Sequence, residues 1–399
     1  MKSKTQNQKS KIVIVGGAVA GASVAIRLAN SGFQVCLIER ERFPRQKLCG
    51  EFVTPECLGH FRALGVLDEM LASGGTDLTE TVFYAPNGRS VAVPSEWFST
   101  GGAALGISRA EMDFQLLNRA RNLGVEVFEE TQAIGLLEEN GEICGITAKT
   151  NDGKKFEIAA DLTIDASGRA AVLATFAKKS QIGKNNNQKT IKNEQIRKRL
   201  VGFKAHLRNS KIERGRCEIY FFPGGYGGLN RVENDLANHC FLIDARVVRK
   251  FGGNADRIVR EVVFKNRRAE EMLETAETAH DWLAVSVDSF GRKNLAPARR
   301  LLAIGDAGAF IDPFTGSGML MALESAEIAA RAIIENSPDF EKISAVYQNL
   351  HQTKFSRRLR VCSVLRRAAF LPNLAATAIY ALSVSNSARF FLARATRQA

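Results

Sequence analysis

The sequence has few of the residues that build metal sites and disulfide frameworks. Its 399 residues include seven cysteines and five histidines, and no two cysteines have C-x-x-C spacing. An odd number of scattered cysteines argues against structural disulfides and zinc, so we expect no metal and a reducing compartment. No apolar segment precedes Lys11. We therefore expect no secretory signal and a cytoplasmic location.

Acidic residues are missing from the last part of the chain. Residues 342–399 contain ten Lys/Arg and no Asp or Glu, and residues 178–200 contain eight Lys/Arg and one acid. The net charge of +13 therefore belongs mainly to these segments, and the body is mildly acidic. A nucleic-acid-binding domain would instead carry a recognition motif within its basic face, so we expect no nucleic acid partner.

The basic C-terminal part has two interpretations. Apolar residues recur at helical spacing among the arginines of 354–367, and an uncharged stretch, 368–388, follows. Pro372 and several Ser/Thr in this stretch argue against a membrane span. A basic amphipathic helix predicts either peripheral membrane contact or a helical cap over a site.

A strand, a glycine turn, a helix and a second strand follow one another at the start of the chain. Residues 16–21 have the sequence G-G-A-V-A-G, with Ala18 in place of the middle glycine of G-x-G-x-x-G. A helix N-terminus after such a turn offers free N–H groups to a pyrophosphate, and Glu39 stands where a carboxylate accepts ribose hydroxyls. The unit predicts a site for FAD or NAD. Its candidate cofactor-binding residues are Gly16, Gly17, Ala20, Gly21, Glu39 and Arg40.

A second glycine-rich segment lies far downstream, at 305–319. Asp306 follows a strand-like run, at the sheet edge where α/β proteins bind ligands, so its carboxylate can hold a polyol chain. Pro313, Gly316 and Gly318 make an N–H-rich turn before a helix. Such a turn can hold the electron-rich edge of a ring.

Together these motifs resemble the FAD-dependent monooxygenase and geranylgeranyl reductase superfamily. The fold of that superfamily is similar to that of para-hydroxybenzoate hydroxylases and flavin-dependent halogenases. The resemblance spans nearly the whole chain and implies FAD as the cofactor. It further implies that the cofactor contacts include Arg109, Ala133, Asp306, Gly316, Gly318 and Met319.

Residues 43–51, F-P-R-Q-K-L-C-G-E, resemble the C-G-E segment of geranylgeranyl reductases, which runs along the flavin. The resemblance implies that Cys49 and Gly50 contact the cofactor and makes Cys49 a candidate catalytic residue. A buried structural thiol is the alternative interpretation of Cys49.

Residues 218–229, E-I-Y-F-F-P-G-G-Y-G-G-L, combine glycines with aromatic residues. They predict an apolar small-molecule pocket that includes Phe221, Tyr226 and Gly227, with Tyr226 as a second candidate catalytic residue. A hairpin turn with core aromatics is the alternative. The segment lacks the Y-x-W-x-F-P of geranylgeranyl reductases, which argues against a polyprenyl substrate.

Several reactions are compatible with the resemblance. Monooxygenation through a flavin 4a-hydroperoxide, which hydroxylates or epoxidises an apolar or aromatic small molecule, is favoured. Geranylgeranyl reductase-like reduction of carbon–carbon double bonds in a lipid is the first alternative, with Cys49 or Tyr226 as proton donor. Halogenation is disfavoured, because Trp97 and Trp282 lack the W-x-W-x-I-P context of halogenases. A non-catalytic FAD-binding scaffold is the alternative from another class.

The sequence contains no second strand–glycine–helix unit. Either NAD(P)H docks without a dedicated domain, or a flavin reductase or another partner delivers the electrons.

The predicted fold class is α/β: a Rossmann-type FAD-binding domain, an interposed and mostly antiparallel β-sheet substrate domain, and a C-terminal helical segment. The expected FAD-binding domain comprises 11–75, 103–175 and 291–340, the substrate domain 76–102 and 200–290, a basic loop 176–199, and a helical cap 341–399.

Overall fold

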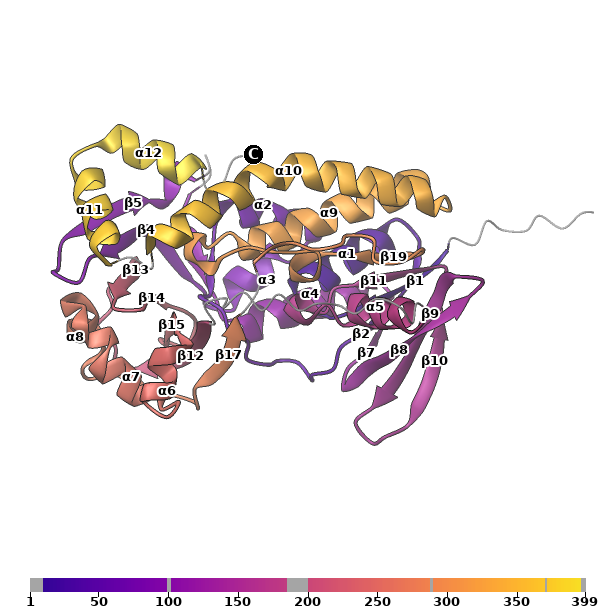
Figure 1. The fold of residues 1–399 in the computed structure, drawn as a ribbon, viewed down its shortest axis with the longest axis horizontal. Helices are drawn as coiled ribbons and strands as arrows, with labels where there is room; N and C mark the ends of the chain where they lie inside the picture. Colours follow the sequence, from indigo (N-terminus) through magenta and orange to yellow (C-terminus); the bar gives the residue numbers. More distant parts are fainter. Residues whose placement is uncertain (1–9, 99–101, 185–199, 288–289, 370–371, 396–399) are drawn as a thin grey trace, which may run out of the picture.

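The computed structural model describes residues 10–98, 102–184, 200–287, 290–369 and 372–395 (Figure 1). A parallel sheet forms one half of the molecule and a larger mixed sheet the other half, and three C-terminal helices lie along one side of both. This arrangement confirms the predicted α/β fold class. It also includes the interposed, mostly antiparallel sheet and the C-terminal helical segment.

The parallel sheet has five strands. Their order is β19 (Leu301–Ala303), β11 (Leu162–Asp165), β1 (Lys11–Val15), β2 (Gln34–Ile38) and β7 (Glu126–Phe128). Nearly every residue of the central strands is buried, as expected for a parallel sheet covered on both faces. Side chains of β1 alternate between two cores: Ile12 and Ile14 face one, and Val13 and Val15 face the other.

Helices and a small sheet cover the two faces of the parallel sheet. One core is shared with α1 (Val19–Asn30), α2 (Pro55–Leu64), α3 (Leu67–Ala72), α4 (Arg109–Asn122) and α9 (Gly318–Asn336). The other is shared with β8 (Thr131–Glu139), β9 (Glu142–Thr150), β10 (Lys155–Ala159) and α5 (Val172–Lys184). Residues 176–184 of the expected basic loop belong instead to α5, because Leu173 and Ala177 are buried and hold this helix against the small sheet. Residues 185–199 lie outside the described part.

The mixed sheet has ten strands. Along its path lie β16 (Glu277–Thr278), β12 (Leu200–Arg208), β15 (Ala237–Asp244), β14 (Gly225–Arg231), β13 (Gly215–Phe222), β4 (Thr76–Tyr84), β6 (Ala104–Gly106) and β3 (Phe52–Val53). Two further strands, β17 (Leu283–Val287) and β5 (Ser90–Pro94), pair with β12 and β4. The pairing between β13 and β4 is parallel and the other pairings are antiparallel.

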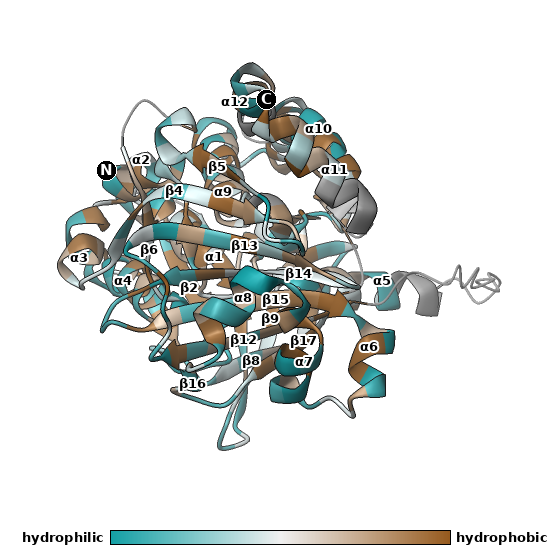
Figure 2. Ribbon diagram, turned by 90° about the vertical axis from the view of Figure 1, so that its left-hand side faces the viewer, coloured by the Kyte–Doolittle hydropathy of each residue, from teal (hydrophilic) through white to brown (hydrophobic). Residues whose placement is uncertain are grey.

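The two faces of the mixed sheet are covered differently. Residues of what we call the helix-covered face pack against α6 (Ala245–Lys250), α7 (Ala255–Glu261) and α8 (Arg267–Leu273); they include Phe203, Ala205, Leu207, Tyr220, Phe222 and Phe241. Figure 2 shows that α7 and α8 consist largely of hydrophilic residues. The opposite face carries Gly202, Lys204, His206, Tyr226, Asn238 and Cys240. We call it the loop-covered face, because residues 48–51 run across it.

The C-terminal helices are α10 (Phe340–Ala369), α11 (Pro372–Ser383) and α12 (Asn386–Ala395). The long helix α10 packs on α9, whereas α11 and α12 lie against β5 at the end of the mixed sheet (Figure 1). Among the described residues, no helix is both long and apolar enough to cross a bilayer. All seven cysteines are free thiols.

Candidate functional site

The glycine turn after β1 fits its predicted role. Gly16 has φ +109°, a backbone conformation that residues other than glycine rarely adopt. A Cβ on Gly21 would lie 1.8 Å from the carbonyl oxygen of Gly16, so the first turn of α1 packs on the strand only with glycine there. Ala18 is extended at φ −78° and caps the N-terminus of α1. The missing middle glycine therefore imposes no backbone strain.

Glu39 lies beside this turn, at the end of β2. Its carboxylate is buried and accepts a hydrogen bond of 2.8 Å from the Gly17 N–H. The Thr131 N–H donates to the Glu39 carbonyl over 2.9 Å, which brings β8 and the buried Ala133 to the same edge. Arg40 differs from these residues, because its side chain is largely exposed and pairs with Glu41.

Two arginines and one aspartate form a buried cluster nearby. Arg109, the first residue of α4, donates to Asp113 over 3.1 and 2.7 Å, and Arg45 donates to the same carboxylate over 3.0 Å. Burial alone would raise the pKa of Asp113, but the charges of Arg109 and Arg45 outweigh it and hold this pKa below its ordinary value. The cluster keeps a net positive charge at the edge of the parallel sheet. Arg45 and Asp113 were not predicted as site residues.

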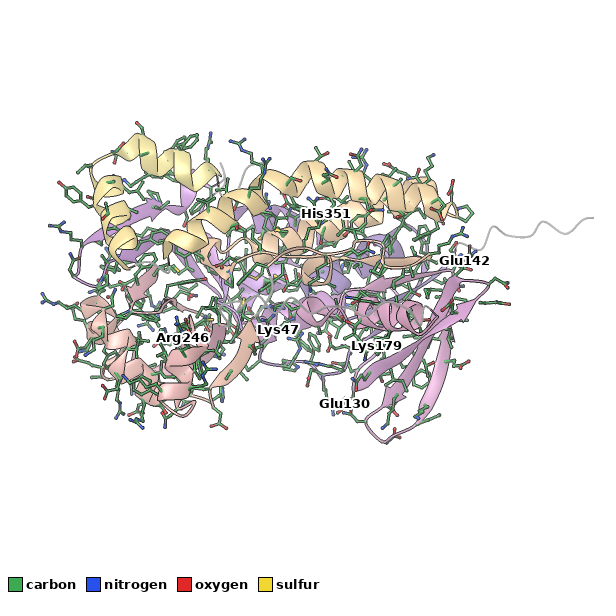
Figure 3. All side chains as sticks on the ribbon, viewed as in Figure 1. Lys47, Glu130, Glu142, Lys179, Arg246 and His351 are labelled. Atoms are coloured by element: carbon green, nitrogen blue, oxygen red, sulfur yellow. The ribbon has the colours of Figure 1, made fainter. Side chains whose placement is uncertain are left out.

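Asp306 follows β19 at the edge where Gly16 and Glu39 follow β1 and β2. Its carboxylate accepts no hydrogen bond from the part of the chain that the structure describes, and burial raises its pKa against the nearby charges of Lys47 and Arg169. Burial, together with the charges of Arg109 and Arg45, lowers the pKa of Lys47 to about 8. Figure 3 shows Lys47 between the two halves of the molecule.

The turn after Asp312 leaves room beside its backbone. Asp312 accepts from the Phe314 N–H over 2.9 Å and so begins a short 3-10 helix, Pro313–Thr315. Gly316 ends it at φ +61°, and α9 starts at Gly318 with Met319 buried behind it. A Cβ on Gly318 would meet only Ile311 at 4.0 Å, and one on Gly50 would meet nothing within 4 Å. Both glycines therefore face space that a flat ring can approach.

Residues 48–51 lie on the loop-covered face. A Cβ on Gly202 would lie 2.8 Å from the end of the Leu48 side chain, so the loop crosses close to the strand at this glycine. Asn238 donates to the Cys49 carbonyl over 3.2 Å, and Asn230 donates to the Glu51 carbonyl over 3.2 Å. These contacts fix the backbone of the C-G-E segment against β14 and β15.

Glu51 is the centre of a buried ionic cluster. Lys204 Nζ donates to Oε1 over 2.5 Å, His206 Nε2 lies 2.6 Å from Oε2, and the Arg109 N–H donates to Oε1 over 2.7 Å. Burial would raise the pKa of Glu51, but the hydrogen bond with His206 and the charge of Lys204 outweigh it, so this pKa lies below its ordinary value. Glu51 thus ties the loop to α4 and to β12. Lys204 and His206, polar residues two apart in the largely apolar strand β12, were missed as site residues.

Aromatic rings gather at the other end of the loop-covered face. Phe314 lies 5.2 Å from Tyr226, 5.8 Å from Phe221 and 6.2 Å from Phe83, measured between ring centroids. The Tyr226 hydroxyl donates to Asp312 over 2.8 Å, and burial followed by the Asp312 charge raises its pKa well above the ordinary value. Ile379 and Leu382 of α11 pack on the same cluster. Tyr226 is therefore a fixed, protonated phenol in an aromatic cluster.

Gly227 does not join this cluster. It pairs with Tyr220 and Phe241, and a Cβ there would lie 2.7 Å from the Phe241 side chain. Successive residues of a strand point to opposite faces, so Gly227 belongs to the helix-covered face when Tyr226 belongs to the other. The structure thus places Phe221 and Tyr226 together and Gly227 behind them.

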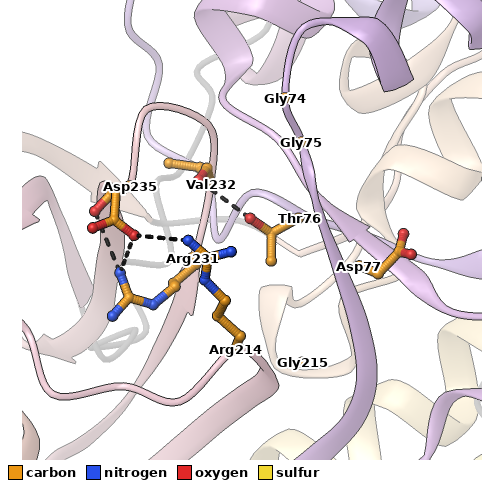
Figure 4. A pocket seen from close by; sticks show the side chains of 9 residues that line it. All are labelled: Gly74, Gly75, Thr76, Asp77, Arg214, Gly215, Arg231, Val232 and Asp235. Carbon is orange, nitrogen blue, oxygen red and sulfur yellow. Dashed lines mark hydrogen bonds and ion pairs between the residues drawn. The ribbon is translucent and has the colours of Figure 1, made fainter.

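A separate hollow of about 370 Å³ lies at the far end of the mixed sheet (Figure 4). Arg231 and Asp235 form an ion pair of 2.8 Å in its wall, and Arg214 lies 3.7 Å from the same carboxylate. Thr76 donates to the Val232 carbonyl over 3.3 Å. None of the candidate cofactor, catalytic or aromatic-cluster residues lines this hollow, and we assign it no role.

Comparison with known proteins identifies the family of this chain. A family model described as "FAD binding domain" matches residues 9–337, which is most of the chain. The chain belongs to this FAD-binding family. The resemblance inferred from the motifs is thereby confirmed, and the residues of the site can be compared with the chemistry of FAD.

The relatives of this FAD-binding protein include two kinds of enzyme. It is 26% identical over 378 residues to a tryptophan 2-halogenase of Chondromyces crocatus, covering 87% of this chain and 66% of the halogenase. It is 27% identical over 346 residues to a digeranylgeranylglycerophospholipid reductase of Methanosarcina acetivorans, covering 84% of this chain and 79% of the reductase. These matches support an FAD-dependent enzyme.

Solved structures share the fold over almost the whole chain. A geranylgeranyl bacteriochlorophyll reductase-like protein of Thermoplasma acidophilum superimposes with a TM-score of 0.79 at 18% identity, covering 98% of this chain and 96% of that protein. A flavin-dependent brominase gives 0.78 at 17% identity, with coverage of 98% and 94%. Identities this low establish the fold alone.

The residues present fit FAD. The glycine turn lets the N-terminus of α1 pack directly on β1, and Glu39 lies beside this turn as a hydrogen-bond acceptor. The carboxylate of Asp306, which accepts no hydrogen bond within the described ranges, suits the hydroxyls of a ribityl chain. Gly50 and Gly318 leave open space where a flat ring can lie. No cluster of metal-ligating side chains was found in the part of the chain that was described.

Proposed function

We propose that this FAD-dependent enzyme is a monooxygenase that hydroxylates or epoxidises an apolar or aromatic small molecule. The observation that carries the proposal is the aromatic cluster of Phe83, Phe221, Tyr226 and Phe314, which lies next to the turn at 313–318. Apolar walls with a few fixed polar groups are typical of sites for small molecules. Apolar surroundings would also exclude water, which oxygen-transfer chemistry requires.

The residues of the site divide into holding and positioning roles. Glu39, the glycine turn, Arg109 and Asp306 would hold FAD, and bound FAD would supply the activation of oxygen. Tyr226 keeps its proton and its position through Asp312, so we assign it to orienting the substrate. Cys49 is held by Asn238 beside the open face of Gly50, where we place one side of the flavin ring.

We propose NAD(P)H as the electron donor, either docking directly or acting through a separate flavin reductase. Five strands form the single parallel sheet of the described part, and Asp306, Gly16 and Glu39 already occupy its ligand-binding edge. A second nucleotide domain is therefore not part of the proposal. The enzyme would take its hydride through the open side of the flavin site.

Reduction of carbon–carbon double bonds is a second candidate, and the position of Cys49 favours it. The thiol interacts with the Arg109 side chain, and the Glu51 N–H donates to its sulfur over 3.4 Å. A fixed thiol beside the ring is a plausible proton donor for a carbanion formed by hydride addition. The digeranylgeranylglycerophospholipid reductases among the relatives support this candidate.

Measurements of oxygen consumption and of ¹⁸O incorporation with the purified, FAD-loaded protein distinguish the candidate functions. The monooxygenase predicts that NADH or NADPH is consumed with oxygen, and that one atom of ¹⁸O₂ enters a product from a panel of planar aromatic acids and terpenoid lipids. Product that gains two hydrogens without oxygen would contradict it and support the reductase. No electron uptake by bound FAD would indicate a scaffold.

The cofactor assignment has its own test. Asp306→Ala should weaken FAD binding by about tenfold to a hundredfold, because the hydrogen bonds to a charged group are lost. Asp161→Ala, at a carboxylate that accepts from the Lys11 N–H away from the site, serves as the control. Unchanged FAD affinity in Asp306→Ala, measured by fluorescence titration, would contradict the assignment.

A further inference from the structure

The C-terminal helices expose more large apolar side chains than the rest of the described surface. Seven such side chains are exposed in the described ranges, and five of them lie between residues 364 and 391. Val384, Phe391 and Val364 are 72%, 68% and 67% exposed. A soluble surface rarely concentrates large apolar groups in this way unless it contacts a partner or a membrane.

Helix α11 carries no charged residue on either side. Ile379 and Leu382 face inward and pack on the aromatic cluster, whereas Thr377 and Tyr380, and Val384 just after the helix, are exposed. None of the twelve residues Pro372–Ser383 is charged. A surface helix in water normally carries charged residues on its outer face, so the outer face of α11 is unusual for a water-facing helix.

Helix α12 is fixed by contacts with the mixed sheet and the turn that follows β5. Arg389 donates to the Ala92 carbonyl of β5 over 3.1 Å, and the Phe390 ring meets Trp97 edge-on at 5.6 Å. These contacts leave Phe391 and Arg394 on the exposed side. The apolar side chains of α12 are therefore presented by a fixed helix.

Within residues 342–399 the charge has one sign. No Asp or Glu occurs from residue 342 to the last residue, and Arg357, Arg360 and Arg394 are exposed. Arg394 lies over the Phe390 ring at 4.6 Å, and Arg89 lies over the Tyr380 ring at 5.3 Å. An aromatic ring beside a guanidinium suits the membrane interface, where the ring enters the acyl boundary and the charge stays with the phosphates.

We propose that α11, α12 and the end of α10 form a docking surface for membranes that contain anionic phospholipids. The docking surface consists of Val364, Tyr380, Val384, Phe391, Arg360 and Arg394. Apolar insertion and attraction to lipid phosphates act together in such a surface, and each alone binds weakly. The proposal concerns binding and does not depend on the reaction that the enzyme catalyses.

The docking surface has a consequence for substrate entry, and this consequence rests on the proposed function. The inner face of α11 packs on the aromatic cluster, while its outer face would lie on the bilayer. An apolar substrate dissolved in the membrane would then reach the site around a single helix. An aromatic acid taken from water would need no such arrangement.

Vesicle flotation with the full FAD-loaded chain tests the docking surface. The protein should float with vesicles of phosphatidylcholine and phosphatidylglycerol in about equal parts, and much less with phosphatidylcholine alone or at high salt. The double variant Val384→Ser with Phe391→Ser should lower the bound fraction about tenfold, because two inserted side chains are lost. Arg360→Gln with Arg394→Gln should lower it several-fold on the anionic vesicles only.

A matched pair elsewhere on the surface provides the control. Leu71 and Ile334 are also exposed, at 47% and 41%, and lie outside the docking surface. Leu71→Ser with Ile334→Ser should leave flotation unchanged. Equal losses from both pairs, or no flotation of the unaltered protein, would overturn the proposal. So would a dimer in size-exclusion chromatography that Val384→Ser with Phe391→Ser disrupts, because the surface would then bind a second copy.

Discussion

The two faces of the mixed sheet are built from the same strands and differ in what they hold. The helix-covered face packs Phe203, Leu207 and Phe241 against α6–α8. At alternate positions of the same strands, the loop-covered face presents Lys204, His206 and Asn238 to the segment 48–51. The period of two along a strand thus separates a largely apolar core from a polar surface for the cofactor loop.

The buried charges of the loop-covered face contribute less to folding stability than apolar packing would, but they fix the position of the cofactor loop. Burying Glu51, Lys204 and His206 costs desolvation energy, and a buried ion pair is often no more stable than well-packed apolar residues. Its geometry, however, fixes Glu51 on three elements at once: β12, the start of α4 and its own loop. We infer that this cluster holds Cys49 and Gly50 beside the cofactor.

The largest effect is expected on the helix-covered face. Phe241 is buried, stacks on Phe203 at 5.0 Å and contacts Trp282 at 5.7 Å. Phe241→Ala should lower the free energy of unfolding by about 4 kcal/mol through lost burial and a cavity. FAD affinity should stay unchanged below the unfolding transition, since the side chain faces away from the loop. Guanidinium unfolding measures the stability of Phe241→Ala, and titration with FAD measures its cofactor affinity. A weakened FAD affinity would contradict the separate roles of the two faces.

A smaller loss of stability, but a larger loss of cofactor binding, is expected for Glu51→Gln. The amide leaves Lys204 buried without its counter-charge, which should cost about 3 kcal/mol. The loop should also loosen, so FAD affinity should fall. The exposed pair of Lys211 and Glu274 is the control: Glu274→Gln should change stability by less than about 0.5 kcal/mol. Unchanged FAD affinity in Glu51→Gln would leave the cluster without a positioning role.

The same variant should change the response to acid. The folded pKa of Glu51 lies below its unfolded value of about 4.3, so its contribution to stability is present above that pH and is lost as the pH falls through the folded pKa. Glu51→Gln should therefore lose less stability between neutral and acidic pH than the unaltered chain. If the stability of the two proteins falls equally with pH, Glu51 does not contribute to the pH dependence of folding.

The contrast between the faces also explains what the sequence could predict. The glycine turn and Glu39 were predictable because their constraints act within 30 residues: Gly21 must clear the carbonyl of Gly16, and Glu39 ends the next strand. The pairing of Glu51 with Lys204 joins residues 153 apart and depends on strand register, which motifs do not specify. Gly227 was grouped with Tyr226 as neighbours in sequence, but adjacent residues in a strand face opposite ways.

The smallest loss of stability is expected from replacing two matched tyrosines, one on each face of the mixed sheet. Tyr226 on the loop-covered face donates to Asp312 over 2.8 Å, and Tyr220 on the helix-covered face donates to Glu218 over 2.8 Å. Each Tyr→Phe change removes one buried hydrogen bond to a carboxylate, so each should cost about 1.5 kcal/mol. Only Tyr226→Phe should lower kcat/KM, by about tenfold, because only Tyr226 adjoins the aromatic cluster beside the cofactor. Equal activity in the two variants would mean that the cluster is packing and that the substrate lies elsewhere.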